Sequence, residues 1–516
     1  MADTPTRKER RAQRKLAKKE QARDPMKKAA EAFEDGMALH QQGHLAKAEA
    51  AYRGAVAANG DFAEAHLNLG VVLHAQGNND TAAQSFERAI ALNPDLAEAQ
   101  YGFGVLLQDQ GKTEDAAARF RRALEIDPDF ILPINGLAIA EQKLGHWDVA
   151  VEGFERALRL NSGFAEAANN LGVLRHKQGR LDDAMASFLR ALEARPDYAE
   201  AHRNYSHVLL LAGFYAEGWR EFQWRWQCDD FPSTRQAFPY PRWLGEPVDG
   251  KEILVWGEQG VGDEVYFASM VPDLIDQGAE VILESDSRLV PLFQRSFPGV
   301  TCIGQDATVK GDIDFQVPSG DLGNWLRPDL NSFPERNSFL IADAARAENL
   351  KFQYRNGGGD FLVGLAWISK NPEVGGDKSM ALMDWTPLAG IPGVTVIDLQ
   401  YGDTEAERRA FEAATGTIII RDDTIDQMDD LDAFAAQILA MDLVISVSNT
   451  TAHISGGLGV PTWVLLHVSP LSVWRQDGDT SPWYPSIRLF RQSKPGAWTD
   501  VITQVESALK ALQTPE

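Results

Sequence analysis

The sequence predicts an α-helical repeat array followed by a two-lobed α/β region. Two observations predict this organisation. Small and aromatic residues recur every 34 positions in the first part of the chain. After a connector with several prolines, short apolar runs of strand length alternate with helical segments. The 516 residues allow two to four domains, and a composition of 44% hydrophobic and 24% charged residues is typical of globular proteins.

Residues 1–28 form a basic head on an acidic protein. The head holds eleven Lys or Arg residues against four Asp or Glu, although the whole chain carries a net charge of −24. The head fits either a tail that binds an acidic surface or a solvated, partly helical extension. The acidic body argues against nucleic acid as the main partner.

Residues 29–228 contain about six repeats. Glycine recurs at Gly43, Gly77, Gly111, Gly145, Gly179 and Gly213, and an aromatic residue at Tyr52, Phe86, Phe120, Phe154, Phe188 and Phe222. Small residues recur at positions such as Gly36, Gly70 and Gly104, and Pro94, Pro128 and Pro196 follow predicted second helices. This is the tetratricopeptide pattern, in which small residues let paired helices approach and the aromatic residue fills the space between them.

Arrays of this kind coil around a concave groove that usually holds a peptide or protein. Asparagine occupies the same position of the first helix in three units, at Asn68, Asn170 and Asn204. These side chains could grip an acceptor backbone, or could be ordinary repeat residues, because Gly102 and Gly136 interrupt the series.

The last repeat has an aromatic stripe, Tyr215, Trp219, Phe222 and Trp226, at spacings of four, three and four. An apolar stripe of this size has to be covered, and we expect it to dock the array onto the next domain. Residues 229–250, which contain four prolines, form the predicted connector.

The α/β region is predicted as a first lobe, 251–355, and a second lobe, 356–516. Runs at 253–256, 281–284, 300–303 and 315–317 predict one parallel sheet. A second series of five strands is predicted within 361–370, 394–402, 416–423, 443–449 and 462–468. Three consecutive glycines at 357–359 suit a hinge between the lobes. We expect the functional cleft at the carboxyl ends of the strands.

The stretch Lys251–Met270 carries the first candidate site. An apolar strand runs into a glycine loop with Gly260 and Gly262, and a helix follows, an arrangement that offers backbone N–H groups to an anion. Asp263 lies at the start of that helix. Its carboxylate is either a helix cap or a proton acceptor beside the ligand.

Two further segments at strand ends suggest an anionic ligand. Lys370 follows a strand and could meet a diphosphate or be a solvated surface lysine. After the strand 443–447 come Ser448, Asn449, Thr450 and Thr451, and then a helix start with His453. Four polar side chains at a helix N-terminus favour phosphate or ribose binding over a capped helix with a buried histidine.

Other compositional features exclude several classes of protein. Cys228 and Cys302 are far apart and lack a CxxC pattern, so we expect neither a disulfide framework nor a zinc site. No apolar run reaches the roughly 20 residues that span a bilayer, so we expect no transmembrane segment and a cytoplasmic location. Acidic pairs such as Asp312 and Asp314 are expected by chance in so acidic a chain, and no metal is assigned to them.

The segments WGEQGVGDEVYF, LAWISKNP, DLQYGD, DLVISVSNTTAHISGGLGVPTWVLL and SPWYPSIRLFRQ resemble the catalytic half of bacterial tetratricopeptide-repeat glycosyltransferases, which are related to heptosyltransferases and to O-GlcNAc transferase. The resemblance covers most of the chain after residue 28. It implies a GT-B fold, Asp263 as catalytic base, and donor contacts from Gly260, Gly262, Lys370, Gln400 and residues Ser448, Asn449, Thr450, Thr451 and His453. It also implies acceptor contacts from Asn68, Asn170 and Asn204.

The sequence departs from the wider family at Ser448 and Asn449, where Asp-Thr is usual. The SNTTAH form resembles repeat-bearing transferases that modify flagellin with nonulosonic acids such as pseudaminic acid, carried as CMP-sugars. We therefore expect transfer from a nucleotide-sugar to Ser or Thr of a protein, without a metal or other cofactor. The alternative is a non-catalytic adaptor or chaperone with a degenerate transferase half. A lipid or oligosaccharide acceptor is a further alternative.

Overall fold

The structure is a computed structural model that describes residues 25–233, 236–309, 311–355, 361–370 and 375–513. Its contacts divide the chain into two compact units. The first holds the residues up to Leu174 with Glu193–Arg195, and the second holds Arg175–Leu192 and everything from Pro196 onward. Most of the basic head and the predicted glycine hinge at 357–359 lie outside the described residues.

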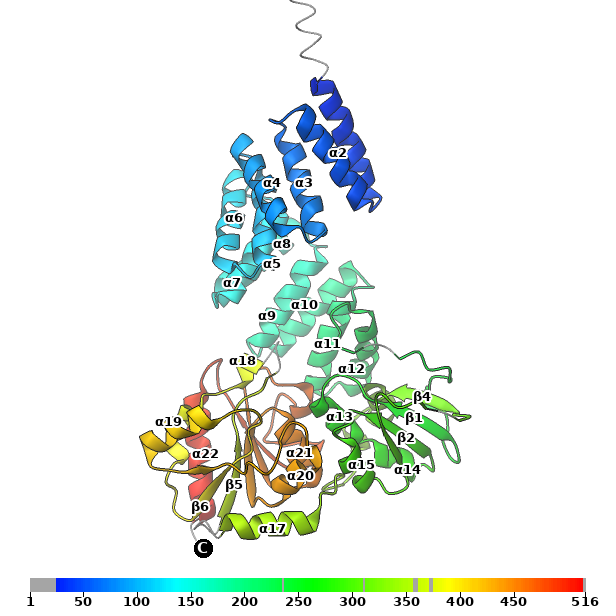
Figure 1. Ribbon diagram of the computed structural model, residues 1–516, viewed down its shortest axis with the longest axis vertical. Coiled ribbons are helices and arrows are strands. Elements are labelled where there is room, and N and C mark those ends of the chain that lie inside the picture. Colours follow the sequence, from blue (N-terminus) through cyan, green and yellow to red (C-terminus); the bar gives the residue numbers. More distant parts are fainter. Residues whose placement is uncertain (1–24, 234–235, 310, 356–360, 371–374, 514–516) are drawn as a thin grey trace, which may run out of the picture. The chain divides into compact units, whose positions relative to one another are not determined.

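The first unit is built from helix pairs. After a helix over residues 25–41, it contains α2 (Leu45–Ala58), α3 (Ala63–Ala75), α4 (Asn79–Leu92), α5 (Ala97–Asp109), α6 (Thr113–Ile126), α7 (Ile131–Lys143), α8 (Trp147–Leu160) and most of α9 (Ala165–Lys177). From α2 to α8, consecutive helices pack side by side, blue to cyan in Figure 1. The predicted helical repeat array is confirmed.

A glycine with positive φ turns the chain between the two helices of each repeat. The φ angle lies between 73° and 90° at Gly43, Gly77, Gly111, Gly145, Gly179 and Gly213. Side chains rarely tolerate this left-handed conformation, so glycine is the residue that ends each first helix. The 34-residue spacing of glycines is therefore the spacing of these turns.

Other glycines make room for the aromatic ring of each repeat. A Cβ atom on Gly104 would lie 2.6 Å from the ring of Phe120 in the same repeat. The glycines that interrupt the asparagine series do the same: a Cβ on Gly102 would lie 2.8 Å from Phe86, and one on Gly136 would lie 2.9 Å from Phe120. Ring packing thus explains why these two positions lack a side chain.

The second unit begins with the last repeats and a four-stranded sheet. The repeat helices are α10 (Leu181–Ala194), α11 (Ala199–Ala212) and α12 (Tyr215–Phe222), which continues as the 3-10 helix η1 (Gln223–Gln227). The strands β1 (Glu252–Trp256), β2 (Glu280–Ser285), β3 (Thr301–Gly304) and β4 (Phe315–Pro318) pair in parallel in the order β3-β2-β1-β4. This confirms the predicted first parallel sheet.

Short helices connect these strands and lead to the next sheet. They are α13 (Val261–Ala268), α14 (Val271–Asp276), α15 (Val290–Ser296), η2 (Ser319–Leu322), α16 (Gly323–Leu326), η3 (Leu330–Ser332) and α17 (Ala344–Arg355). Figure 1 shows this part in green. Helix α13 follows β1 directly, as the strand, glycine loop and helix pattern predicts.

The second sheet has seven strands in the order β10-β11-β9-β8-β5-β6-β7. They are β5 (Phe361–Ala366), β6 (Val394–Asp398), β7 (Ile419–Ile420), β8 (Leu443–Val447), β9 (Thr462–Leu466), β10 (Thr480–Ser481) and β11 (Tyr484–Arg491). Only the β10–β11 pair is antiparallel. The sequence predicts the first five strands but not the last two, because Pro485 and polar residues break the apolar pattern of β11.

The helices of this part are α18 (Gly375–Lys378), η4 (Leu382–Leu388), α19 (Glu405–Thr415), α20 (Leu431–Leu439), α21 (Thr450–Leu458), η5 (Ser472–Trp474) and α22 (Trp498–Gln513). One apolar core joins the sheet to α22 and η4, with Trp385, Ile445 and Val505 almost fully buried. Among the described helices, none is both long and apolar enough to cross a membrane.

The aromatic stripe of the last repeat is covered, as predicted. Tyr215, Trp219 and Phe222 are at most 4% exposed. Their ring partners are Phe333, Trp483 and Phe267, with centroids 5.3, 6.4 and 6.5 Å away, and Trp226 lies 5.4 Å from Trp256. The last repeat therefore shares one hydrophobic core with the α/β part.

Candidate functional site

The loop after β1 places Asp263 in the first turn of α13. Gly260 precedes the helix in an extended conformation, and its N–H donates to Asp263 Oδ2 at 3.3 Å. The carboxylate therefore caps its own helix, which is one of the two roles predicted for it. Burial raises the pKa of Asp263 above its ordinary value, while the Gly260 N–H and the charge of Lys378 oppose the shift.

The N-terminus of α21 carries the second group of predicted residues. Asn449 caps the helix, because its Oδ1 accepts from the N–H of Ala452 at 3.3 Å. Its Nδ2 donates to the carbonyl of Ile368, and Ser448 Oγ accepts from Trp474 Nε1 at 2.8 Å. Of this polar group, Asn449 and Ser448 thus serve the fold.

The two threonines and the first N–H groups of α21 are the parts of this segment that suit a ligand. Thr451 is fully buried and its Oγ1 has no hydrogen-bond partner among the described residues. Thr450 is partly buried and lies beside the Asp263 loop. The first N–H groups of any helix also lack partners within that helix, and they favour an anion.

His453 lies one turn into α21 and is 5% exposed. Its Nδ1 shares a 2.9 Å hydrogen bond with the hydroxyl of Tyr484 in β11, and the ring stacks against Trp474 at 5.3 Å. Burial, reinforced by the charge of Lys378, lowers the pKa of His453 to about 3. The imidazole is therefore neutral at physiological pH.

The Asp263 loop and the start of α21 meet directly. A Cβ atom on Gly262 would lie 3.3 Å from Cδ2 of His453 and 3.5 Å from Oγ1 of Thr450. Glycine at this position lets the two helix N-termini approach, although β1 and β8, which precede them, belong to different sheets. The structure thus brings together Gly262, Asp263, Thr450 and His453, four of the predicted site residues.

Lys378, which the sequence analysis did not select, belongs to the same cluster. It ends the short helix α18 and is 4% exposed. Burial lowers its pKa to about 8, and the charge of Asp263 opposes this shift. The sequence favours Lys370 because that residue directly follows a strand. The signal for Lys378 is weaker, since it is a lysine in a glycine-rich loop at the same sheet edge.

Lys370 is exposed, and its Nζ lies 5.5 Å from the centroid of the Tyr401 ring. Gln400 is 1% exposed, and both ends of its amide are used within the protein. Its Oε1 accepts from the backbone N–H groups of Trp367 and Ile368 at 2.9 and 2.7 Å, and its Nε2 donates to the carbonyl of Tyr401. Gln400 therefore fixes the strand end from which Lys370 projects.

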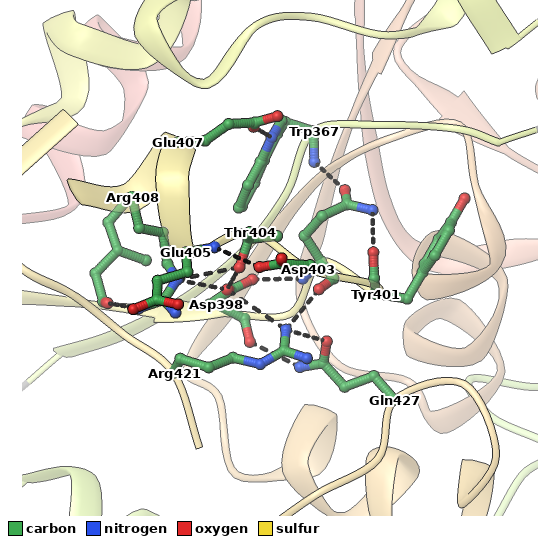
Figure 2. Close-up of polar contacts among 12 residues, drawn as sticks. Trp367, Asp398, Tyr401, Asp403, Thr404, Glu405, Glu407, Arg408, Arg421 and Gln427 are labelled. Carbon is green, nitrogen blue, oxygen red and sulfur yellow. Dashed lines mark hydrogen bonds and ion pairs between the residues drawn. The ribbon is translucent and has the colours of Figure 1, made fainter. Parts of the chain in front are cut away.

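A buried polar network holds Gln400 in place. Figure 2 shows Asp398, at the end of β6, among Thr404, Arg408 and Arg421. Arg421 also donates to the carbonyl of Gln400 at 2.6 Å. Both arginines balance the buried carboxylate, and through Gln400 the network links the end of β6 to the backbone that follows β5.

The predicted acceptor residues are divided between the two units. In the first unit, Asn68 donates to the carbonyl of Glu64 in its own helix at 2.9 Å, and Asn170 donates to Asn135 Oδ1 at 3.3 Å. In the second unit, Asn204 is partly buried on α11. The contact between Asn135 of α7 and Asn170 of α9 fits a row of polar side chains along the array. A role of the asparagines in acceptor binding stays a prediction.

A cavity of about 530 Å³ lies in another part of the second unit, against the ends of α10 and α11. Its lining includes Arg180, Phe214, Arg475 and Gln476. The residues of the cluster around Asp263 do not line this cavity.

Comparisons with known protein families match the repeats. A tetratricopeptide-repeat family matches residues 33–97 and 135–217, and another matches residues 73–138. A protein named FlbA from Caulobacter vibrioides is 34% identical over 324 residues, which make up 59% of this chain and 54% of FlbA. The chain thus spans about half the length of this curated relative.

Solved structures match the chain in part. PilF of Pseudomonas aeruginosa has 19% identity and a TM-score of 0.35, with 39% of this chain and 91% of PilF covered. The APC/C hetero-tetramer Cut9–Hcn1 has 17% identity and a TM-score of 0.37, with 39% of this chain and 40% of that chain covered. The family matches show that the chain contains tetratricopeptide repeats over residues 33–217, and the structure adds an α/β region after them.

Proposed function

We propose that the protein is a glycosyltransferase of GT-B type, which moves a sugar from a nucleotide-sugar to a Ser or Thr hydroxyl of a protein held by the repeats. The observation that carries the proposal is the cluster at the meeting of α13 and α21. A carboxylate, a buried lysine and a helix N-terminus converge there from two sheets. The resemblance of the segments around Asp263 and His453 to bacterial repeat-bearing transferases supports the same function.

Each group in the cluster suits one part of the transfer. Asp263 would accept the proton of the attacking hydroxyl while the sugar–phosphate bond breaks, and its raised pKa favours that role. Lys378 and the N-terminus of α21 would stabilise the departing phosphate. Neutral His453, held by Tyr484, would offer a hydrogen bond to the donor without a competing charge. No step in this scheme calls for a metal.

The acceptor and the sugar are the finer parts of the proposal. Tetratricopeptide arrays usually hold proteins, so the repeats favour a protein acceptor over a lipid or an oligosaccharide. The SNTTAH segment favours a CMP-linked nonulosonic acid, with flagellin as the protein that receives it. This donor class predicts that the site prefers a cytidine nucleotide.

Nucleotide binding is the first test. Isothermal titration calorimetry of the full chain with CMP, UDP, GDP and ADP should show saturable binding of at least one, with CMP the strongest. Lys378→Met should weaken that binding about ten-fold or more, because a buried charge partner of the phosphate is lost. Absence of binding by all four nucleotides would instead favour a non-catalytic adaptor.

The second test separates binding from chemistry. With a donor chosen from the first experiment, Asp263→Asn should lower the rate of transfer to the acceptor protein by roughly 100- to 10,000-fold. Its nucleotide affinity should stay within about two-fold of the wild type, because the phosphate contacts remain. Glu348→Gln, an exposed change on α17, is the control. Full activity of the Asp263 variant, read by intact-mass spectrometry, would rule out the general base.

A further inference from the structure

The loop that carries Asp263 has a backbone conformation that needs external support. Gln259 has a φ of 65°, and Arg475 is the other non-glycine residue with positive φ in the described part of the chain. Side chains disfavour this left-handed region, so such a residue persists only where its surroundings fix it. Gln259 lies four residues before Asp263, in the turn that sets the direction of α13.

The support comes from Glu258, whose side chain is fully buried. Its two carboxylate oxygens accept from Arg225 Nη2 and Nε at 2.6 and 2.7 Å. One of them also accepts from the N–H of Gly320 at 2.8 Å. The neighbouring N–H of Gln259 donates to Ser233 Oγ at 2.5 Å. The loop is thus held by a repeat residue, by the connector and by η2.

Arg225 belongs to η1, the continuation of the last repeat helix, and is itself 0% exposed. Its guanidinium lies 4.2 Å from the ring of Phe222 and 4.6 Å from that of Trp226. It also donates to the carbonyl of Phe222 and to Asp321 Oδ1, at 3.0 and 2.9 Å. This fixed geometry makes Arg225 a rigid support for Glu258.

The charges of the group are balanced. Burial alone would lower the pKa of Arg225, but the charges of Glu258 and Asp321 raise it above its ordinary value. Arg242 forms a further ion pair with Asp321 and also donates to Gln223 Oε1 at 2.7 Å. Well-packed apolar residues often stabilise a fold as well as a buried ion pair does, so stability alone does not explain these four charges.

We propose that Arg225 is a positioning residue of the catalytic site: through its bidentate contact with Glu258 it fixes the Gly257–Gly260 turn and thereby the place of Asp263. This inference rests on the proposed function for its kinetic consequence. Lys378 of α18 and the N-terminus of α21, which are the groups proposed to hold the phosphate, belong to other segments, so the contact should affect the rate of transfer far more than nucleotide binding.

The key variant replaces both partners, Arg225→Met together with Glu258→Gln. Changing one partner would leave an uncompensated buried charge and could unfold the protein, whereas the double change removes both charges. If the pair serves only stability, a double variant with a normal Tm should also have wild-type activity. If it positions Asp263, the variant should fold and still transfer sugar slowly.

The double variant should have a Tm within a few degrees of wild type and a nucleotide Kd within about two-fold of wild type. Its kcat should be at least about 30-fold lower, because displacing a catalytic group by about 1 Å can cost 100-fold in rate. The matched control removes both partners of another bidentate ion pair, Arg295→Met together with Asp432→Asn. This pair joins α15 to α20, and its side chains are 35% and 21% exposed. Wild-type kcat in the double variant, or an equal loss of kcat in the control, would overturn the proposal.

Hydrogen exchange provides a readout that does not depend on activity. In the double variant, peptides covering residues 257–268 should exchange at least about ten-fold faster, while peptides of α21 keep their wild-type rates. Unchanged exchange at 257–268 would overturn the positioning role even if no nucleotide bound. Failure of the proposed function would instead appear as absence of nucleotide binding by the wild-type chain, with the exchange result intact.

Discussion

At the scale of single residues, the carboxyl groups around the start of α13 have different surroundings. Asp263 faces Lys378, whereas the next residue, Glu264, points into the four-stranded sheet. Glu264 accepts from the N–H of Asp286 at 2.7 Å and from Gln305 Nε2 at 3.1 Å. The two adjacent acidic residues therefore have different surroundings: Asp263 belongs to the candidate site, and Glu264 bonds to residues at the ends of β2 and β3.

The burial of Glu264 predicts how stability depends on pH. Burial raises its pKa from 4.5 to about 8 in the folded protein. The folded state thus keeps a proton that the unfolded state releases above pH 4.5, so stability falls as the pH rises from about 4.5 to 8. By pH 8 the loss is on the order of 3–5 kcal/mol.

Glu264→Gln should remove this dependence. The Tm of the variant relative to wild type should therefore rise by several degrees between pH 5 and pH 8, as measured by circular dichroism in matched buffers. The exposed change Glu348→Gln should show no such trend. Parallel profiles of the Glu264 variant and wild type would contradict the buried, protonated carboxyl. Glu284, whose pKa burial raises to about 7, adds a smaller effect of the same sign to both proteins.

Single residues were the least predictable part of the site. The positions of Asp263 and of the 448–453 segment could be predicted, because strand ends and helix starts have local signatures. Lys378 could not, since its burial depends on how a glycine-rich loop folds over the sheet edge. Arg225 stands within an aromatic run, and its partner Glu258 is 33 residues away in the sequence. The position of Arg225 between Trp224 and Trp226 is the sequence signal that could have suggested that its side chain is buried.

At the scale of elements, each repeat is specified by a glycine turn and by one aromatic ring. Both features have a fixed sequence spacing, which is why the repeats were predictable residue by residue. The strand pair β10–β11 was not, because its pairing depends on β9 and not on its own pattern. Sequence periodicity predicts an element whose structure depends on its own residues. It does not predict a strand that forms only by pairing with a neighbouring strand.

The packing of Gly104 against Phe120 predicts a coupled pair of substitutions. Gly104→Ala should destabilise the first unit by about 1–3 kcal/mol, because the new Cβ would meet the ring, even though alanine favours helices. Phe120→Leu should partly relieve the clash, so the double variant should lose less than the sum of the single changes. Thermal unfolding of the full chain followed by circular dichroism measures this coupling, and strict additivity would contradict it.

At the scale of the whole molecule, the last repeat belongs to the same compact unit as the α/β part. The stripe residues Tyr215, Trp219 and Phe222 complete the core that contains Phe267 and Trp483. Removal of this repeat would therefore expose a large aromatic surface on the remaining protein.

This predicts two different outcomes for truncation. A chain that begins at Ser162 keeps the whole of α9 and should be folded and monodisperse, because the core of the second unit stays intact. A chain that begins at Asp229 should aggregate or fail to accumulate, because the partners of the stripe become exposed. Size-exclusion chromatography with light scattering distinguishes the two, and a monodisperse Asp229 chain with an unchanged Tm would contradict the shared core.

The turn glycines of the first unit have a consequence for how the repeat array can change in length. Each repeat of this unit carries its own turn glycine and its own aromatic ring, so insertion or deletion of one 34-residue unit keeps the same kind of turn and ring packing along the array. The final repeat cannot be exchanged in this way, because its aromatic stripe packs into the core of the α/β part. Gene duplication should therefore lengthen or shorten the array from its amino-terminal side, while the junction sequence from Tyr215 to Trp226 stays constant in length.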